Sequence, residues 1–344
     1  AVIIQDAIVE IKPFVAFAIL YAVAPPLTSS EKKVIKIVSI VNCILISLVL
    51  FGGNNIINSS MRHPAFAGAG ILISTMALLY VSIDKPTYKP SPTILGIVIL
   101  FLTVGLLCGR SKYYGIYLLS LFFFFIYKPG MLHHFKMKHI LAVLGIIAAV
   151  IIAGWSKFEY YFLSSPTSAL AFDTTDAAAR PALYLVGLLI LVNNFPFGSG
   201  LASFASFQSG ESYSPLYYEY GLNYVWGLSP STANFICDAF YPSLAQFGVA
   251  GVILFIFFFA FIIKRLAILQ RYDVHIFKYD YIIGVLLVLF LLIECIAGTV
   301  MVQLQGFVAL MMLGIITSKA KPYIKLRKQQ KALNHKSKFP SIKF

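Results

Sequence analysis

The stretch LGIVILFLTVGLLCGRSKYYGIYLLSLFFFFI, residues 95–126, decides the fold. Two apolar runs, Leu95–Cys108 and Ile116–Ile126, lie on either side of a short gap that carries Arg110 and Lys112. Similar apolar runs recur along the chain, which is 59% hydrophobic and 12% charged and has a mean hydropathy of +0.85. Soluble domains carry about 25% charged residues, so the sequence predicts a protein that crosses a membrane many times.

The spans are expected to be helices. Within lipid the backbone must satisfy its own hydrogen bonds, which leaves helices or a closed barrel, and these runs are continuous rather than alternating. We therefore predict an all-α, polytopic helical membrane protein that forms one integral membrane domain, residues 1–344. About nine spans are expected, with one large external loop between the sixth and the seventh: Pro13–Leu27, Val34–Phe51, Ala65–Ile83, Thr93–Cys108, Tyr113–Tyr127, Ile140–Trp155, Ser243–Ile263, Tyr281–Ala297 and Thr299–Thr317, the last two forming a tight hairpin around Gly298.

Positive charges assign the two sides of the membrane. The tail, residues 319–344, holds nine Lys and Arg residues and no acid, so we place it in the cytoplasm. Its last part, KLRKQQKALNHKSKFPSIKF, residues 325–344, is expected to be disordered and to face lipid. With this orientation, 21 of the 27 Lys and Arg residues lie on the cytoplasmic side. The same bias accounts for the net charge of +14, so no nucleic-acid partner is expected. The N-terminus then lies outside. Because the chain begins with Ala1 and shows no signal peptide, we expect the natural chain to begin earlier, with an odd number of further spans.

Residue patterns of metal and nucleotide sites are missing from the sequence. The stretch GSGLAS departs from GxGxxG at its last position, and GxxxxGK[ST] does not occur. We therefore expect no cofactor and no metal. The four cysteines, Cys43, Cys108, Cys237 and Cys295, are scattered without CxxC spacing, so they indicate neither a metal site nor a disulfide framework, and the three in or beside apolar runs are expected to be buried thiols. His133, His134 and His139 lie with lysines on a predicted cytoplasmic loop, and no metal is expected there.

The large external loop, residues 156–242, contains the apolar stretch Ala182–Val192, which is too short to span. We expect a short helix there, lying at the outer membrane surface and introduced by the segment DTTDAAARP. A Pro/Gly turn follows in NNFPFGSGLASF, residues 193–204, and then the aromatic-polar segment SYSPLYYEYGLNYVWG, residues 212–227.

Three arginines are expected at the outer membrane boundary. Arg62 precedes the third span, Arg110 lies in the turn between the fourth and fifth, and Arg180 begins the surface helix. A guanidinium group binds phosphate through two hydrogen bonds and stays charged. Each arginine alone is equally explained by an acidic partner or by lipid phosphates, but together they favour one shared anion, the diphosphate of a lipid carrier. His63 and Lys112 are their neighbours, and we place both with the same ligand.

The acids and aromatic residues of the loop suit a sugar. Tyr218 and Trp226 are candidates for stacking on sugar rings, with an interfacial aromatic belt as the alternative. Asp238, just before the seventh span, is placed to take a proton from a sugar hydroxyl; a helix N-cap or an arginine partner is the alternative role. Glu294, near the outer end of the eighth span, is expected to pair with an arginine. The other external acids are Asp173, Asp176, Glu211 and Glu219.

Four segments resemble the O-antigen polymerase/ligase superfamily, in order and over most of the chain. RPALYLVGLLILVNNFPFGSGLASF, residues 180–204, resembles its arginine, short helix and Pro-x-Gly-x-Gly turn. DAFYPSLAQFGVAGVILF, residues 238–255, resembles the segment that follows. GRSKYYG, residues 109–115, and MRHPAFAG, residues 61–68, resemble two earlier turns, the second in a compressed form.

This resemblance implies a membrane glycosyltransferase of the GT-C type, acting on undecaprenyl-diphosphate-linked oligosaccharide at the outer face of the bacterial inner membrane. It implies diphosphate-binding roles for Arg110 and Arg180. Ligases of this superfamily carry His-Asn where this chain has Cys237-Asp238, which favours a polymerase that makes O-antigen, capsule or exopolysaccharide and that works beside a chain-length regulator. A ligase that transfers glycan to lipid A core or protein stays open. So does a precursor transporter or flippase, although no inverted repeat is seen.

Overall fold

The structure is a computed structural model that describes residues 2–61, 63–83, 87–128, 179–273, 275–326 and 329. Its thirteen α-helices confirm the predicted all-α class for this part of the chain. Three helices are long and apolar enough to cross a membrane: Ser29–Phe51, Pro64–Val81 and Phe240–Tyr272. Shorter apolar helices lie at Pro92–Cys108, Ser111–Ile126, Ala179–Asn193 and Leu304–Ser318, so the described residues show three helices of membrane length rather than nine.

Each predicted span that falls on described residues overlaps a helix, although several bounds differ; Ile140–Trp155 lies outside the described residues. Short turns extend three helices: α5 by a 3₁₀ turn at Gly105–Cys108, α6 by a π turn at Phe122–Ile126, and α11 by a 3₁₀ turn at Leu244–Phe247 that leads into α12. In chain order the α-helices are α1 (Val2–Val23), α2 (Ser29–Phe51), α3 (Gly53–Met61), α4 (Pro64–Val81), α5 (Pro92–Val104), α6 (Ser111–Leu121), α8 (Ala179–Asn193), α9 (Phe207–Glu211), α10 (Leu216–Glu219), α11 (Phe240–Ser243), α12 (Gly248–Tyr272), α13 (Lys278–Glu294) and α14 (Leu304–Ser318).

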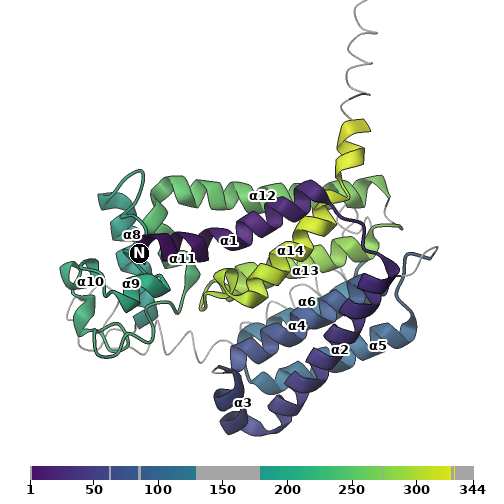
Figure 1. Cartoon of the computed structure of the whole chain (residues 1–344), viewed down its shortest axis with the longest axis horizontal. Helices are drawn as coiled ribbons and strands as arrows, with labels where there is room; N and C mark the ends of the chain where they lie inside the picture. The colour runs from purple at the N-terminus through teal and green to yellow at the C-terminus, as the bar shows by residue number, and fades with distance from the viewer. Residues whose placement is uncertain are drawn as a thin grey trace, which may run out of the picture.

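The long helices lie side by side and run between two ends of the molecule, with α1 packed on α14 and α2 on α4 (Figure 1). One end, which we call the basic end, joins α1 to α2, α4 to α5 and α12 to α13, and receives the end of α14. The other, the loop end, joins α5 to α6 and α13 to α14 and carries the short helices α8 to α11 (Figure 1).

Helices α2 and α12 expose long apolar faces. Ile37, Val41 and Leu48 of α2 and Leu254 and Phe257 of α12 are all largely exposed. A soluble protein does not leave apolar surface of this extent in water, so these faces suit contact with lipid tails. Helix α4 packs against α2, α5 and α14, and 72% of its apolar segment is buried.

The first helix begins eleven residues before the predicted span, at Val2 rather than at Pro13. Proline is favoured in the first turn of a helix, but α1 continues on both sides of Pro13. The side chains of Asp6 and Glu10 are buried. The carboxylate of Asp6 accepts a hydrogen bond from the main-chain N–H of Ala202 at 2.7 Å, a long-range contact that compensates the burial of this acid.

The predicted tight hairpin around Gly298 is wrong. Helix α13 ends at Glu294 and α14 begins at Leu304, so residues 295–303 form a longer connection with a 3₁₀ turn at Val300–Val302. The carbonyl groups of residues 295–297 accept hydrogen bonds from other segments of the chain instead of from residues of the same helix.

The basic tail is ordered where the structure describes it. Residues 321–326 are helical, and the Lys321 ammonium donates a hydrogen bond to the carbonyl of Ala22 at 2.8 Å. This hydrogen bond fastens the start of the tail to the end of α1. In the segment expected to be disordered, residues 325, 326 and 329 are described and are helical, so the expectation does not hold for them. Apart from residue 329, the remainder lies outside the described residues.

Candidate functional site

Two helix starts meet at the loop end. Gly109 adopts a positive φ of 64°, which turns the chain sharply after Cys108 and places Arg110 as the N-cap of α6. His63 is the N-cap of α4, where its Nδ1 accepts a hydrogen bond from the N–H of Ala65 at 3.2 Å. The Arg110 Nη2 and His63 Nε2 atoms lie 3.0 Å apart. Residues 47 positions apart in the chain thus become neighbours.

Lys112, in the first turn of α6, reaches the end of α13. Its ammonium lies 2.6 Å from Glu294 Oε2 and donates a second hydrogen bond to the carbonyl of Ala297 at 2.8 Å. The Glu294 carboxylate is 7% exposed, so this ion pair is mostly withdrawn from water. The prediction that Glu294 pairs with an arginine is therefore wrong. Its partner is Lys112, at the start of α6.

Arg180 and Asp238 form an ion pair between α8 and the start of α11. Arg180 lies in the first turn of α8, which begins at Ala179, three residues before the predicted apolar stretch. Asp238 precedes Ala239, the N-cap of α11, so it does not cap that helix itself. Of its two alternative roles, the arginine partner is therefore the one seen in the structure.

Electrostatic effects show that these groups share one neighbourhood. Burial lowers the pKa of His63, and the positive charges of Arg110, Lys112 and Arg180 lower it further. Burial also raises the pKa of Asp238 above its usual value, although Arg180, Lys112 and Arg110 partly offset this effect. Each of the three cations thus acts on both titrating groups. We call Arg110, Lys112 and Arg180 the cationic cluster, and His63 lies beside it.

The connection after α13 holds these pieces in place. Three successive carbonyl groups bind three different segments: Cys295 accepts from the N–H of Phe240 at 3.1 Å, Ile296 from the Tyr184 hydroxyl at 2.8 Å, and Ala297 from Lys112. Tyr184 lies one helical turn after Arg180 on the same face of α8. The carbonyls of residues 295–297 therefore fix the starts of α6, α8 and α11 relative to one another.

The Pro/Gly turn after α8 is fastened to the start of α12 by its main chain. The N–H groups of Ser199 and Gly200 donate to the carbonyls of Ala245 and Gln246 at 3.3 and 2.9 Å. Gly198 and Gly248 face each other so closely that a Cβ at either position would clash with the other main chain, and both have positive φ. Only glycine permits both this approach and this backbone conformation.

Described residues 179–245, which we call the loop layer, have a small hydrophobic core of their own. Leu183 and Ile190 of α8 pack with Phe204 and with Tyr217, which is fully buried. The Tyr217 hydroxyl lies 2.9 Å from the N–H of Ala205 and 2.8 Å from Ser209 Oγ, so its one polar atom is satisfied. This core gives α8 a rigid support on the side away from the other long helices.

The two predicted sugar-stacking residues are exposed in the loop layer. Tyr218 is 57% exposed and packs edge-on against Tyr213, and Trp226 is 69% exposed and packs against Phe235. In the part of the chain that the structure describes, neither ring is joined to the cationic cluster by a hydrogen bond or a ring contact. Both are nevertheless open to a ligand that approaches the loop layer.

The sequence interpretation missed two residues of this region, Tyr184 and Asp6, and several residues that it named are not described by the structure. Tyr184 could have been found from its spacing to Arg180, whereas the contact of Asp6 with Ala202 left no local signal. Arg62, Asp173 and Asp176 lie outside the described residues, as do His133, His134 and His139. The described residues contain no group of three or more His, Cys, Asp or Glu side chains that could hold a metal ion.

Comparison of the chain with protein-family models, curated proteins and solved structures finds no match.

Proposed function

We propose that this chain is an integral-membrane glycosyltransferase that polymerises undecaprenyl-diphosphate-linked oligosaccharide repeat units. One observation carries the proposal. Arg110, Lys112, Arg180 and Asp238 come from segments up to 128 residues apart, yet they form one neighbourhood at the end of the molecule away from the basic tail. Three cations, of which Lys112 is also paired with Glu294, lie beside the Asp238 carboxylate of raised pKa. This arrangement suits a reaction in which a diphosphate leaves and a hydroxyl loses its proton.

The cations are proposed to bind the diphosphate. Arg110 Nη2 and His63 Nε2 lie within hydrogen-bond distance of each other, at 3.0 Å. The Arg110 guanidinium has further N–H groups that can donate to an anionic oxygen. Arg110 is therefore proposed to bind the diphosphate beside His63, and Lys112 and Arg180 add positive charge nearby.

Asp238 is proposed to act as the general base. Without substrate its carboxylate is paired with Arg180. A bound diphosphate competes for this guanidinium and releases the carboxylate, whose burial raises its pKa and makes it a better proton acceptor. The acceptor hydroxyl oxygen then bonds to the anomeric carbon and its proton passes to Asp238. The bond from that carbon to the phosphate oxygen breaks, and the polyprenyl diphosphate leaves with the electron pair.

The proposed setting is a bacterial inner membrane crossed about nine times, with the loop end outside and the basic end and the tail in the cytoplasm. The exposed apolar faces of α2 and α12 support a membrane setting. The positive charges Lys32, Arg271 and Lys319 at the basic end support this orientation under the positive-inside rule. A loop layer with a core of its own is more natural for an enzyme than for a transporter, although a flippase would also use cations to bind a lipid diphosphate.

The test uses the full chain, purified in detergent and supplied with undecaprenyl-diphosphate-linked repeat unit alone. A ladder of products on a gel is expected from the native protein, and Arg110→Ala should lower its yield at least about 100-fold. The matched control is Arg271→Ala, which removes an exposed arginine at the basic end and should leave the ladder intact.

Other outcomes contradict the proposal. A full ladder from Arg110→Ala would remove the proposed role of the cationic cluster. Product that forms only after lipid A core or a protein acceptor is added would make the chain a ligase. Passage of the lipid across vesicle membranes without any transfer product would make it a transporter.

A further inference from the structure

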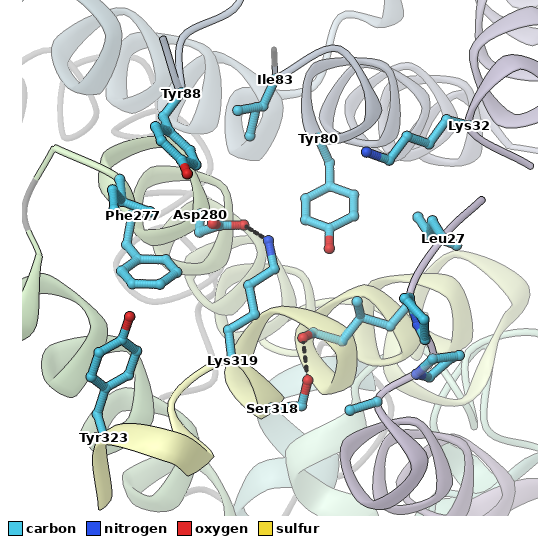
Figure 2. Close-up of a pocket in the computed structure, with 15 residues that line it drawn as sticks. Leu27, Lys32, Tyr80, Ile83, Tyr88, Phe277, Asp280, Ser318, Lys319 and Tyr323 are labelled. Atoms are coloured by element: carbon cyan, nitrogen blue, oxygen red, sulfur yellow. Dashed lines mark hydrogen bonds and ion pairs between the residues drawn. The ribbon is translucent and has the colours of Figure 1, made fainter. Parts of the chain in front are cut away.

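A second polar site lies at the basic end, remote from the cationic cluster. It is a pocket of about 500 Å³ formed where α1 meets α2, α4 meets α5 and α12 meets α13, and it is closed by the end of α14 (Figure 2). These are four places in the chain where helices end, so the pocket opens at the level where the apolar helices stop. In a membrane protein this is the depth of the lipid headgroups.

The side chains that line the pocket carry a net charge of one positive unit. Two lysines and one aspartate line it: Lys32 from α2, Lys319 from the end of α14 and Asp280 from α13. The Lys319 ammonium lies 2.6 Å from Asp280 Oδ1, and Asp280 is buried, so these two charges neutralise each other. Lys32 therefore supplies the net charge of the lining, and Figure 2 shows its ammonium directed into the pocket beside Tyr80.

The other lining groups combine hydroxyl donors with apolar surface. Tyr80, Tyr88 and Tyr323 bring phenol groups to the pocket, while Leu27 and Ile83 line it with aliphatic carbon (Figure 2). Tyrosine is common at this depth because its ring is apolar and its hydroxyl is polar. One lysine, several phenol donors and an apolar wall suit a phosphate group attached to a lipid. The phosphate would pair with the lysine and accept hydrogen bonds from the phenols, while the first carbons of the acyl chains would pack on the apolar wall.

We propose that this pocket binds the phosphate headgroup of an anionic phospholipid, with Lys32 as the residue that selects for negative charge. Basic pockets between transmembrane helices on the cytoplasmic side are known to bind such headgroups. The bound lipid would add a further contact between helix ends that the Lys319–Asp280 ion pair and the Lys321–Ala22 hydrogen bond already join. This inference is independent of the proposed transferase activity.

The test titrates the full chain, in dodecyl maltoside, with dioleoylphosphatidylglycerol or with dioleoylphosphatidylcholine, and follows the apparent unfolding temperature. The anionic lipid should raise this temperature in a saturable way and the zwitterionic lipid should not. Lys32→Gln should raise the half-saturating concentration about fivefold, the factor that corresponds to roughly 1 kcal/mol for one basic side chain. Lys32→Arg, which keeps the charge, should stay close to the native protein.

The matched control is Lys33→Gln, because Lys33 is the next residue of α2, carries the same charge, is exposed and does not line the pocket. Its half-saturating concentration should change less than twofold. Equal responses to the two lipids, or equal losses in Lys32→Gln and Lys33→Gln, would overturn the proposal. Glycerol 1-phosphate distinguishes the source of the phosphate: stabilisation by this soluble compound to the same extent would assign the pocket to a free phosphate ester and overturn the lipid assignment.

Discussion

The two ends of the molecule use ion pairs differently. At the loop end, Lys112 pairs with Glu294 and Arg180 with Asp238, and these pairs lie beside further cations, Arg110 among them. At the basic end, Lys319 pairs with Asp280 in a pocket whose lining has one further charge. Arg110, Lys112 and Arg180, which the structure describes at the loop end, each contact a neighbouring side chain. Ion pairs of the same kind therefore lie within a group of cations at the loop end and in a pocket with one further charge at the basic end.

The largest expected effect is on the proposed reaction. Asp238→Asn should lower the turnover number at least about 100-fold, because an amide accepts no proton from the acceptor hydroxyl. Binding of undecaprenyl diphosphate should be kept, since the cationic cluster remains and Arg180 loses a competing carboxylate. Both are measurable on the purified chain, by product ladders and by equilibrium binding.

Asp273→Asn is the control at the basic end, where Asp273 accepts hydrogen bonds from the N–H groups of His275 and Ile276. It should leave turnover unchanged. Equal losses of turnover in the two variants would remove the distinction between the two ends.

The next effect concerns stability and compares the buried acids directly. Lys112→Met strands Glu294, which is 7% exposed, and Lys319→Met strands Asp280, which is 6% exposed. Removing one partner of a buried pair costs about 3 kcal/mol, because the remaining charge is left without compensation. The free energy of unfolding in detergent should therefore fall by a similar amount in both variants. The double variants Lys112→Met/Glu294→Leu and Lys319→Met/Asp280→Leu should recover most of the loss, and no recovery would show that charge burial is not the cause.

A smaller effect is expected on the titration of His63. Because burial and three nearby cations lower its pKa, its NMR titration midpoint should lie below the usual value of about 6.5. The unfolded chain then takes up this proton first as the pH falls, so the stability contributed by the neutral imidazole is present above pH of about 6.5 and is lost as the pH falls toward the folded pKa. Arg110→Ala should raise the midpoint. The signal is assigned by its loss in His63→Gln. A midpoint unaffected by Arg110→Ala would show that Arg110 does not lower the pKa of His63.

The smallest effect is expected in the loop layer. Trp226→Ala should raise the KM for the lipid-linked oligosaccharide several-fold with little change in kcat, because a stacked aromatic ring contributes mainly to binding. Stability should change by less than about 0.5 kcal/mol, since the ring is 69% exposed. Phe197→Ala is the control, with a ring that is 78% exposed in the same layer. Equal KM changes in both variants would argue against a specific sugar contact.

The sequence was sufficient to predict the all-α class and the approximate position of most long helices among the described residues. Apolar runs marked these helices, although α1 begins eleven residues before the predicted span and the connection from α13 to α14 is longer than expected. Arg110 and Arg180 lie at the same end because each lies at the start of a helix on that side of the bundle. Contacts between distant segments were not predictable. The pairing of Glu294 with Lys112 depends on how α13 packs beside α6, and the start of α1 depends on a main-chain donor in Ala202 that satisfies Asp6. Neither contact leaves a periodic or local pattern in the sequence.

The close approach of Gly198 and Gly248 has a consequence for how such a chain can diversify. The bonds that fasten this turn to α12 come from the main chain, and the carbonyls of residues 295–297 fix the starts of α8 and α11. Exposed side chains in residues 205–235, including Tyr218 and Trp226, are therefore free to change without moving Arg180 or Asp238. The buried residues of this segment, Tyr217 among them, pack on α8 and belong to the frame, so its exposed side chains alone are the positions to vary when the proposed sugar contacts are altered.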